Sequence, residues 1–493
     1  MSKSRLLLVS LLALSALTAC GGSSNNSESK GDDSSGGGSG DKAEIKDKWW
    51  KTTGTLEFDD DNKPVFNNVS IKLTSVVAGE DQASFEDIIA EFNATHAGEI
   101  NVQFTSVNQA EYETTVSKQI ANNMNAPDLL MSHQKGHKSF VANKLIQPYD
   151  EAMEASGLRI NVKGDFVNKL AKYCDLGYKG WTFDVPADAQ STIIVYNKDE
   201  LKKLGAQLPS NHAEFVDLCQ QYKTKTGNYA VVWNTTEVFY PNYVLDTALA
   251  QNGFEFYGSD DYVHWSSSDN VAAFKNGLNA VRDLTRTGLA SSSMASSTAL
   301  DQFTSNKALF LFYMPWNTTS LFQTYSTKNG GMSIAAVQDK IGGFSMAGLF
   351  AQDENNVNAQ AIFGDSHFFA LSKTCEDINK KAAALEFLKW FTENGDVGAT
   401  WAEAGHVTAS TIISNSQDYL NNNYVENYIS AFYPDLNYFE TSGNTEYYNE
   451  IFTTGLFELY AKVRSNNDDS KDEAQLKEYE SRINELIEFL KEE

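Results

Sequence analysis

The chain comprises 493 residues, of which 41% are hydrophobic and 21% charged, and it carries a formal net charge of −26. This composition is ordinary for a globular protein, and so acidic a chain disfavours nucleic acid and anionic lipid as partners. The chain is longer than a domain with a single hydrophobic core usually is, so we expect two lobes or domains.

The N-terminal segment predicts export. A basic start precedes an apolar run from Leu6 to Ala19, which is shorter than the about 20 residues that a membrane-spanning helix needs. This pattern is typical of a secretory signal peptide. The sequence LTAC at residues 17–20 resembles the lipobox of bacterial lipoproteins. That resemblance implies removal of residues 1–19 and a diacylglycerol on the thiol of Cys20, with a plain signal peptide as the alternative.

A polar linker follows. Residues 20–48 are dominated by glycine, serine and charged side chains, as in GGSSNNSESKGDDSSGGGSGDK. Such a segment has almost nothing apolar to bury, so we expect a flexible tether. With a lipid on Cys20, the tether predicts a protein held at the extracytoplasmic face of the bacterial cell membrane. We expect the folded part to begin near Trp49.

Hydrophobic periodicity predicts alternating strands and helices in the first part of the folded chain. These elements, strand and helix in turn, are expected at 69–77, 83–96, 100–107, 112–124 and 127–132. The apolar face of the second helix is predicted to include Tyr112 and Met124. This order is typical of a parallel sheet covered by helices on both faces.

The rest of the chain continues this alternation. Further strands and helices are predicted at 191–197, 211–223, 271–288, 308–314 and 377–395. Apolar residues of the tail, from Leu476 to Leu490, predict one helix docked on the body rather than a coiled coil, because they cover barely two heptads. Residues 56–66 predict a polar hairpin, since the aspartates within them lack the glycine and terminal glutamate of a calcium loop.

Three cysteines remain after Cys20, namely Cys174, Cys219 and Cys375. An odd number excludes a complete disulfide framework, so we expect buried free thiols, with one disulfide pair as the alternative. No spacing of cysteine or histidine matches a metal site. We therefore expect neither a metal nor another cofactor.

Several segments, in a fixed order, resemble a known family. They are FEDIIAEFNATHAGEINVQF, YETTVSKQIANNMNAPDLLMSHQ, KLIQPYDE, VPADAQSTIIVYNKDELKKLG, FTSNKALFLFYMPWNTT, SHFFALSK and KAAALEFLKWFTENGDVGATWAEAGHVTAS. Together they resemble the extracellular solute-binding proteins of ABC importers, specifically the sugar-binding group that includes maltose-binding protein. The chain departs from the family at His406, where proline often follows the glycine, and at residues 49–68, which are not part of the usual start.

The resemblance implies an α/β fold of two lobes, each a mainly parallel sheet flanked by helices. Lobe 1 would comprise residues 49–187 plus 364–410, and lobe 2 residues 188–363 plus 411–493. Crossovers near Ala187–Gln190 and Ile362–Gly364 would form the hinge on which a monomer closes around its ligand. The transmembrane subunits of an ABC permease would recognise the closed form.

Sheets of this kind bind ligands at the carboxyl ends of their strands, so the loops that follow the strands hold the candidate ligand contacts. Sugars offer hydroxyl groups and apolar faces, so polar and aromatic side chains in these loops are the candidates. By the resemblance, Trp316 matches a sugar-stacking tryptophan, with a core role as the alternative, and Gln190 matches a contact at the hinge. The other candidates are Glu80, Asp81, His133, Gln134, Trp233, Asn234, Tyr240, Asn317, Asp365 and His367.

Some assignments have an alternative reading. Glu80 and Asp81 are also explained as charges at a helix N-terminus, and Trp401 and His406 fit the core as well as the site. The overall expectation is a binding protein for a carbohydrate, with an oligosaccharide favoured. A polyamine is the alternative ligand, because the chain is acidic. An extracellular carbohydrate-active enzyme is the weakest alternative, because no nucleophile–base motif is present.

Overall fold

The computed structural model describes residues 42–492 except 237–238, 444 and 465–467. The signal peptide, Cys20 and most of the tether lie outside the described residues. Within them, no helix combines the length and the apolar character needed to cross a membrane. The three described cysteines are buried and unpaired, which confirms the expected free thiols.

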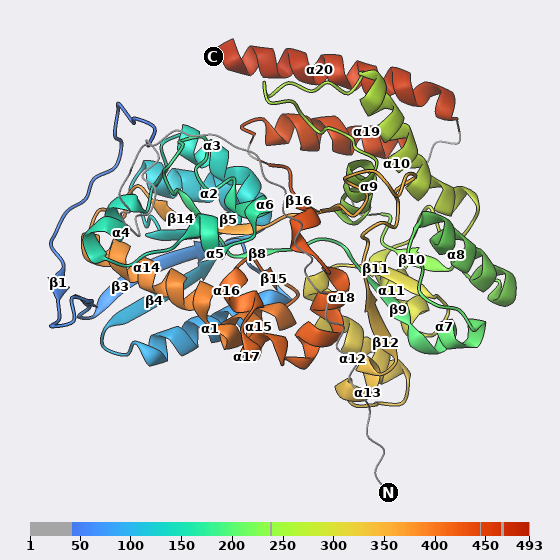
Figure 1. Ribbon diagram of the computed structural model, residues 1–493, viewed down its shortest axis with the longest axis horizontal. Coiled ribbons are helices and arrows are strands. Elements are labelled where there is room, and N and C mark those ends of the chain that lie inside the picture. The colour runs from blue at the N-terminus through green and yellow to red at the C-terminus, as the bar shows by residue number, and fades with distance from the viewer. Residues whose placement is uncertain (1–41, 237–238, 444, 465–467, 493) are drawn as a thin grey trace, which may run out of the picture. The chain divides into compact units, whose positions relative to one another are not determined.

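The first sheet has the strand order β4-β3-β5-β14-β6, with β7 also paired to β14 (Figure 1). Its strands are β3 (Val69–Ser75), β4 (Ile100–Ser106), β5 (Leu129–His133), β6 (Ile146–Gln147), β7 (Asp184–Pro186) and β14 (His367–Ser372). Strands β3, β4 and β5 are parallel, as predicted. Strand β14 runs antiparallel to β5, β6 and β7, because it returns from the second sheet.

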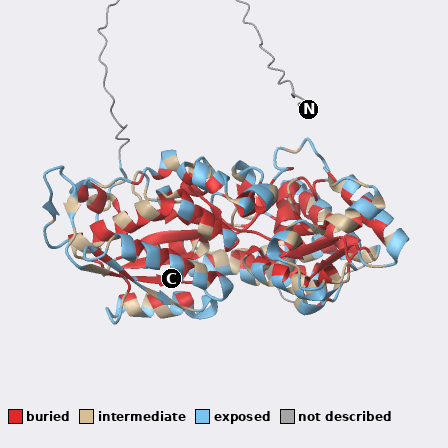
Figure 2. Ribbon diagram, turned by 90° about the horizontal axis from the view of Figure 1, so that it is seen from below, coloured by how far each residue is buried: buried red, intermediate tan, exposed pale blue. Residues whose placement is uncertain are grey.

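Both faces of the first sheet are covered. In β5, Leu129 and Met131 belong to the core that includes α1 (Glu80–Thr95) and α14 (Ile378–Glu393). Leu130, which points the other way, packs with residues of α2 and α3. These two helices span Gln109–Ala121 and His137–Ala142. Figure 2 shows the strands buried beneath helices whose outer sides are exposed.

The segment that departs from the family start packs on the first sheet. Trp49 donates its indole N–H to the carbonyl of Ile146 at 2.8 Å, and Trp181 donates to the carbonyl of Ala43 at 2.7 Å. The predicted hairpin is confirmed by antiparallel β1 (Glu57–Phe58) and β2 (Pro64–Val65). Ile45 and Trp49 also pack against the core on the α2 and α3 side of the sheet, so the packed part of the chain begins before Trp49, within the expected tether.

The second sheet has the order β10-β11-β9-β12. Its strands are β9 (Ile193–Asn197), β10 (Val231–Trp233), β11 (Phe310–Tyr313) and β12 (Ile341–Phe344). Strands β10 and β11 are parallel, but β9 is antiparallel to β11 and β12, which differs from the mainly parallel sheet expected. The direction of a strand depends on the path of the segments that connect it to its neighbours, and hydrophobic periodicity does not predict that path.

Helices flank this second sheet. They are α7 (Lys198–Leu204), α8 (His212–Thr226), α9 (Phe239–Gln251), α10 (Ser268–Arg286), α11 (Ser296–Thr304), α12 (Thr318–Lys328) and α13 (Ile334–Gln338). Shorter helices of the remaining chain are α4 (Asp150–Ser156), α5 (Val162–Asp165), α6 (Asn168–Ala171), α15 (Gly395–Glu403), α16 (Thr411–Ser414), α17 (Gln417–Leu420) and α18 (Ser430–Phe432).

The C-terminal part consists of a π-helix, η5 (Asn449–Phe457), followed by α19 (Glu458–Val463) and α20 (Asp472–Glu492). Helix α20 lies beside α19 and α10 in Figure 1 and packs as a single helix, as predicted. Its buried apolar residues are Leu476, Tyr479, Ile483 and Ile487, whereas Leu490 is 37% exposed. A buried ion pair between Arg282 and Asp472, at 2.7 Å, fixes its first turn.

One helix end differs from the prediction. Helix α2 stops at Ala121, so Met124 lies beyond it and is 68% exposed rather than on the apolar face. The physical reason is local, because Asn123 and Asn125 adopt positive φ angles of 49° and 51°. Asparagine tolerates this left-handed conformation, which ends a helix.

The expected crossovers are short paired segments. In the first, β8 (Asp188–Ala189) pairs with β15 (Val407–Thr408). In the second, β13 (Ile362–Phe363) pairs with β16 (Phe439–Glu440). Just beyond them, Gln190 and Asp365 form a β-bridge, so the crossovers lie side by side.

Candidate ligand-binding site

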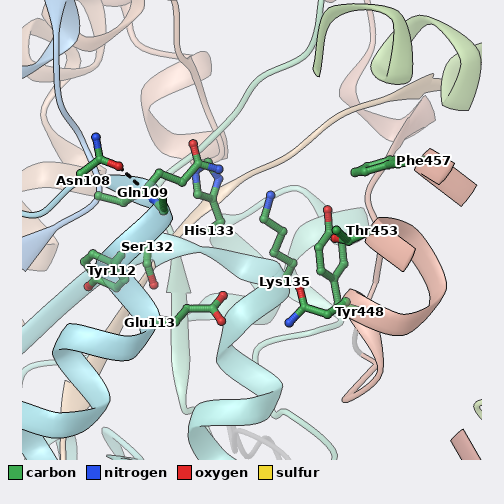
Figure 3. A pocket seen from close by; sticks show the side chains of 13 residues that line it. Asn108, Gln109, Tyr112, Glu113, Ser132, His133, Lys135, Tyr448, Thr453 and Phe457 are labelled. Carbon is green, nitrogen blue, oxygen red and sulfur yellow. Dashed lines mark hydrogen bonds between the residues drawn. The ribbon is translucent and has the colours of Figure 1, made fainter. Parts of the chain in front are cut away.

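A pocket of about 560 Å³ opens at the carboxyl ends of β3 and β5. Helix α2 forms one side and η5 the other, and Lys135 lies between His133 and Tyr448 (Figure 3). Its lining residues are Val76, Asn108, Gln109, Ala110, Tyr112, Glu113, Ser132, His133, Lys135, Tyr448, Asn449, Thr453 and Phe457. The wall thus combines amide, hydroxyl, imidazole and aromatic groups.

Local structure explains why polar groups reach the pocket. Strand β4 ends at Ser106, and Asn108 then caps α2 by accepting a hydrogen bond from the main chain of Ala110 at 3.0 Å. Strand β5 ends at His133, and a 3-10 turn over Gln134–Gly136 places Lys135 at 5.1 Å from the ring centroid of Tyr448. Cation–π contact thereby joins β5 to η5.

The pocket's cation has a buried counter-charge. Lys135 Nζ lies 2.8 Å from Asp365 Oδ2, and His133 Nδ1 lies 3.0 Å from the same oxygen. Burial would raise the pKa of Asp365, but Lys135 and His133 hold it well below its usual range. Burial lowers the pKa of His133 to about 4, against the attraction of Asp365. At neutral pH, therefore, Lys135 and Asp365 form a neutral pair beside an uncharged imidazole.

A second buried cluster adjoins this pair. His133 and His367 have ring centroids 4.7 Å apart, and His367 Nδ1 lies 2.9 Å from Asp188 Oδ2. Trp401 donates its indole N–H to the same oxygen at 2.8 Å and stacks on His406 at 4.0 Å between centroids. Burial would raise the pKa of Asp188, but the two histidines near it, His367 and His406, lower it to about 2. The carboxylate of Asp188 is therefore ionised although it is buried.

Trp316 lies outside the pocket lining. It is half-buried in the 3-10 turn Pro315–Asn317, and Asn317 beside it is also half-buried. Gly405 packs so closely here that an added Cβ would lie 2.4 Å from the carbonyl carbon of Pro315. Glu80, the first residue of α1, accepts a hydrogen bond from the hydroxyl of Ser320 just after this turn.

Five of the remaining candidates lie at or beside the pocket, the Lys135–Asp365 pair or the cluster around Asp188. His133 lines the pocket, and Asp365 forms an ion pair with Lys135, which also lines it. Asp81 and His367 belong to the second cluster, since Asp81 Oδ2 lies 3.1 Å from His406 Nε2. Gln190 is 4% exposed, and its Oε1 has no hydrogen-bond partner in the described part of the chain.

Four candidates have other surroundings. Gln134 is buried and donates to the carbonyl of Gly443 at 2.6 Å. Trp233 is buried, packs edge-on against Phe312 and lines a separate cavity of about 30 Å³. Asn234 is buried and accepts hydrogen bonds from Thr236. Tyr240 falls in α9, with its side chain outside the described positions.

Several pocket residues were not predicted. Asn108 and Gln109 directly follow a predicted strand, so the strand-end argument could have identified them. Lys135 follows the predicted His133 and Gln134. Asn449, Thr453 and Phe457 come from η5, and Tyr448 directly precedes it. No signal in the local sequence ties this segment to β5.

A family model described as bacterial extracellular solute-binding protein matches residues 78–397. The sn-glycerol-3-phosphate-binding periplasmic protein UgpB of Shigella dysenteriae is 26% identical over 204 residues, which are 39% of this chain and 45% of that protein. UgpB of Salmonella typhimurium is 25% identical over 222 residues, 42% of this chain and 49% of that protein. The chain thus matches about half the length of these relatives.

Solved structures show the same fold. The sugar-binding protein MalE of Xanthomonas citri superposes with a TM-score of 0.68 at 14% identity, covering 86% of this chain and 98% of that chain. The GacH receptor of Streptomyces glaucescens has a TM-score of 0.64 at 16% identity, covering 85% and 99%. The periplasmic-binding-protein-like fold expected from the sequence is confirmed. Because the family model matches more than half of this chain, the chain belongs to the bacterial extracellular solute-binding proteins of ABC transporters.

Proposed function

We propose that this solute-binding protein is a lipid-anchored receptor that captures a neutral carbohydrate, favouring an oligosaccharide, and delivers it to an ABC permease. The ligand would enter the pocket between β5 and η5, and the lobes on either side of the paired crossovers would close on it. A pocket of about 560 Å³ lies within the usual range for small-molecule sites.

One observation carries the choice of a neutral ligand. The cation in the pocket, Lys135, is already paired with buried Asp365 at 2.8 Å. The other polar groups are mostly amides and hydroxyls, which suit a ligand rich in hydroxyl groups. Tyr448 and Phe457 add aromatic faces for the apolar side of a sugar ring.

The structural neighbours support this proposal. The GacH receptor is described in complex with acarbose, and a Bdellovibrio bacteriovorus maltodextrin-binding domain is bound to maltotriose. Both share the fold of this chain at low identity, so they support a class of ligand and not a particular sugar. Length and linkage of the sugar would be set by the side chains that differ.

A phosphorylated polyol is the second candidate, because the matched relatives are named for sn-glycerol 3-phosphate. It would require Lys135 to exchange Asp365 for phosphate, which leaves Asp365 buried without its cation. A polyamine fits less well, because Glu113 is the one carboxylate among the described lining residues and Lys135 shares the wall.

A thermal-shift screen tests the proposal. Mono- and oligosaccharides, glycerol 3-phosphate and spermidine would each be added to the protein lacking its signal peptide. A ligand at a hundredfold excess over its Kd stabilises the folded state by about 2.7 kcal/mol. We expect this shift with a neutral oligosaccharide, which should be recovered chemically unchanged. A shift with glycerol 3-phosphate or spermidine alone would overturn the assignment.

A further inference from the structure

We propose that Asp188, His367 and His406 bind a single zinc ion beside the paired crossovers. One ligand atom from each residue lies within 4.8 Å of the others, and all three residues are buried. Asp188 lies in β8 of the first crossover, His367 begins β14 after the second, and His406 follows α15. The proposed site is therefore assembled from three distant segments of the chain.

The ligand atoms already converge. Asp188 Oδ2 lies 2.9 Å from His367 Nδ1 and 3.4 Å from His406 Nδ1. Asp188 is held in place because its Oδ1 accepts a hydrogen bond from the main chain of His367 at 2.9 Å. Trp401 stacks on His406 with an interplanar angle of 5°, which fixes the orientation of that imidazole. Such support is what a metal site requires of its surroundings.

An unpartnered nitrogen points to a ligand. His406 Nε2 lies 3.1 Å from Asp81 Oδ2, so this nitrogen carries the ring proton. His406 Nδ1 faces Asp188, is buried, and has no hydrogen-bond partner among the described residues. In a neutral imidazole this arrangement directs a lone pair at a carboxylate, which is unfavourable in a dry interior. Asp188 Oδ2 already accepts a hydrogen bond from Trp401, and a cation between the two atoms would give the lone pair of His406 its partner.

The charges balance with a divalent ion. Asp81 and Asp188 are 7% and 0% exposed, and two positive charges would balance these two buried carboxylates. A zinc ion supplies both while each histidine stays neutral. Asp81 then has the usual role of a carboxylate that orients a metal-bound histidine. Imidazole and carboxylate are also ligands that zinc accepts, with a solvent molecule as a possible fourth ligand.

The position of the site gives the ion a role. It would connect both crossovers to the loop at Gly405 and His406, which packs against Pro315 and Trp316. Bound zinc would therefore fix the base of the hinge and stabilise the folded protein. This role is independent of which solute occupies the pocket.

Titration with zinc chloride tests the site. Full-length protein without its signal peptide, free of any histidine tag and treated with chelator, would be titrated by calorimetry. We expect one Zn²⁺ per chain and a loss of at least tenfold in affinity in Asp188→Asn and His406→Gln. His264→Gln is the control, because the side chain of His264 is exposed and pairs with Asp260, away from the proposed zinc ligands. Asp81→Asn, which retains all three ligands, should weaken binding by about 10- to 100-fold.

A second measurement does not depend on the ligand variants folding. Unmodified protein with Co²⁺ in place of Zn²⁺ should show visible absorption typical of nitrogen and oxygen coordination, at one equivalent. Far-ultraviolet circular dichroism checks that each variant is folded. Absence of stoichiometric metal binding by unmodified protein, or binding that folded Asp188→Asn and His406→Gln retain in full, would overturn the proposal.

Discussion

The main chains of Gln190 and Asp365 donate hydrogen bonds to each other, with N···O distances of 2.9 and 2.8 Å. The two crossovers therefore form one ribbon. A closing motion of the proposed lobes would have to bend both segments together, since bending one alone breaks this pair.

Gly364 is the residue that permits this pairing. A Cβ at this position would lie 2.1 Å from the carbonyl oxygen of Gln190, which belongs to the main chain and cannot rotate away. We expect Gly364→Ala to lower the free energy of unfolding by about 1–3 kcal/mol, the usual cost of overpacking. Urea denaturation would measure it.

A matched control is Gly258→Ala. The atoms nearest to a Cβ there belong to the exposed side chains of Asp260 and His264, and not to the main chain. Its unfolding free energy should change by less than that of Gly364→Ala. Equal effects of the two substitutions would show that the crossover pairing is not the cause.

Trp316 is half-buried and lies outside the pocket lining, so its predicted sugar contact needs a direct test. If it stacks on a sugar, Trp316→Ala should cost about 1–3 kcal/mol of binding, or roughly 5- to 150-fold in affinity. Trp316→Phe should lose less, because a smaller ring remains. Calorimetric titration and a denaturant melt on the same variant separate the two roles. A loss of about 3–5 kcal/mol in stability with unchanged affinity would assign Trp316 to the core.

Lys135 and Asp365 should be strongly coupled. Lys135→Met leaves the buried carboxylate without its cation, and we expect a loss of about 3–5 kcal/mol in stability. The double variant Lys135→Met with Asp365→Asn removes both charges and should recover much of this loss. Denaturation of the unmodified protein, Lys135→Met, Asp365→Asn and the double variant gives the coupling free energy, and additive effects would mean that the pair contributes little.

Asp246 predicts an unusual pH dependence. Burial raises its pKa to about 8, although the hydrogen bond that Tyr460 donates to it acts in the opposite direction. Tyr243 and Tyr448 line the same small cavity. The folded state then holds a proton that the unfolded state releases near its ordinary value of 3.8, so this group's contribution to stability decreases as pH rises toward 8. Asp246→Asn removes the effect, at about 1.4 kcal/mol per pKa unit.

The measurement is the free energy of unfolding at pH 5 and pH 8. Relative to unmodified protein, Asp246→Asn should be more stabilising at pH 8 than at pH 5. Asp217→Asn, an exposed position on α8, serves as the control. The same difference at both pH values would contradict a raised pKa.

Cys20 carries the prediction of a lipid anchor. Cys20→Ser should move the protein from the membrane fraction to the soluble fraction of its host, because the thiol that accepts the lipid is lost. Metabolic labelling with a fatty acid checks the modification directly. Labelling and membrane retention that survive the substitution would disprove the lipoprotein assignment.

Local patterns accounted for much of the fold. The helical spacing of Phe85, Ile88 and Phe92 located α1, and all three residues are buried. The direction of β9 could not be predicted, because it depends on the path between the sheets and not on periodicity. Met124 was misplaced for a different reason, since backbone conformation at two asparagines ended the helix early.

The site was less predictable than the fold. His133 could be found because it ends a recognisable strand, and Asn108 could have been found by the same argument. The contact of Lys135 with Asp365, and that of Asp81 with His406, join residues far apart in sequence. No local pattern encodes such pairs, so the charge balance of the pocket appears only when the chain is folded.

The buried thiols of Cys174, Cys219 and Cys375 have a practical consequence. Burial raises the pKa of each, so the reactive thiolate is suppressed as well as shielded from solvent. In a chain that begins after Cys20, a cysteine introduced at exposed Thr453 on the pocket rim would be the thiol that a maleimide dye modifies. Fluorescence of that dye would then report ligand capture without removal of any native cysteine.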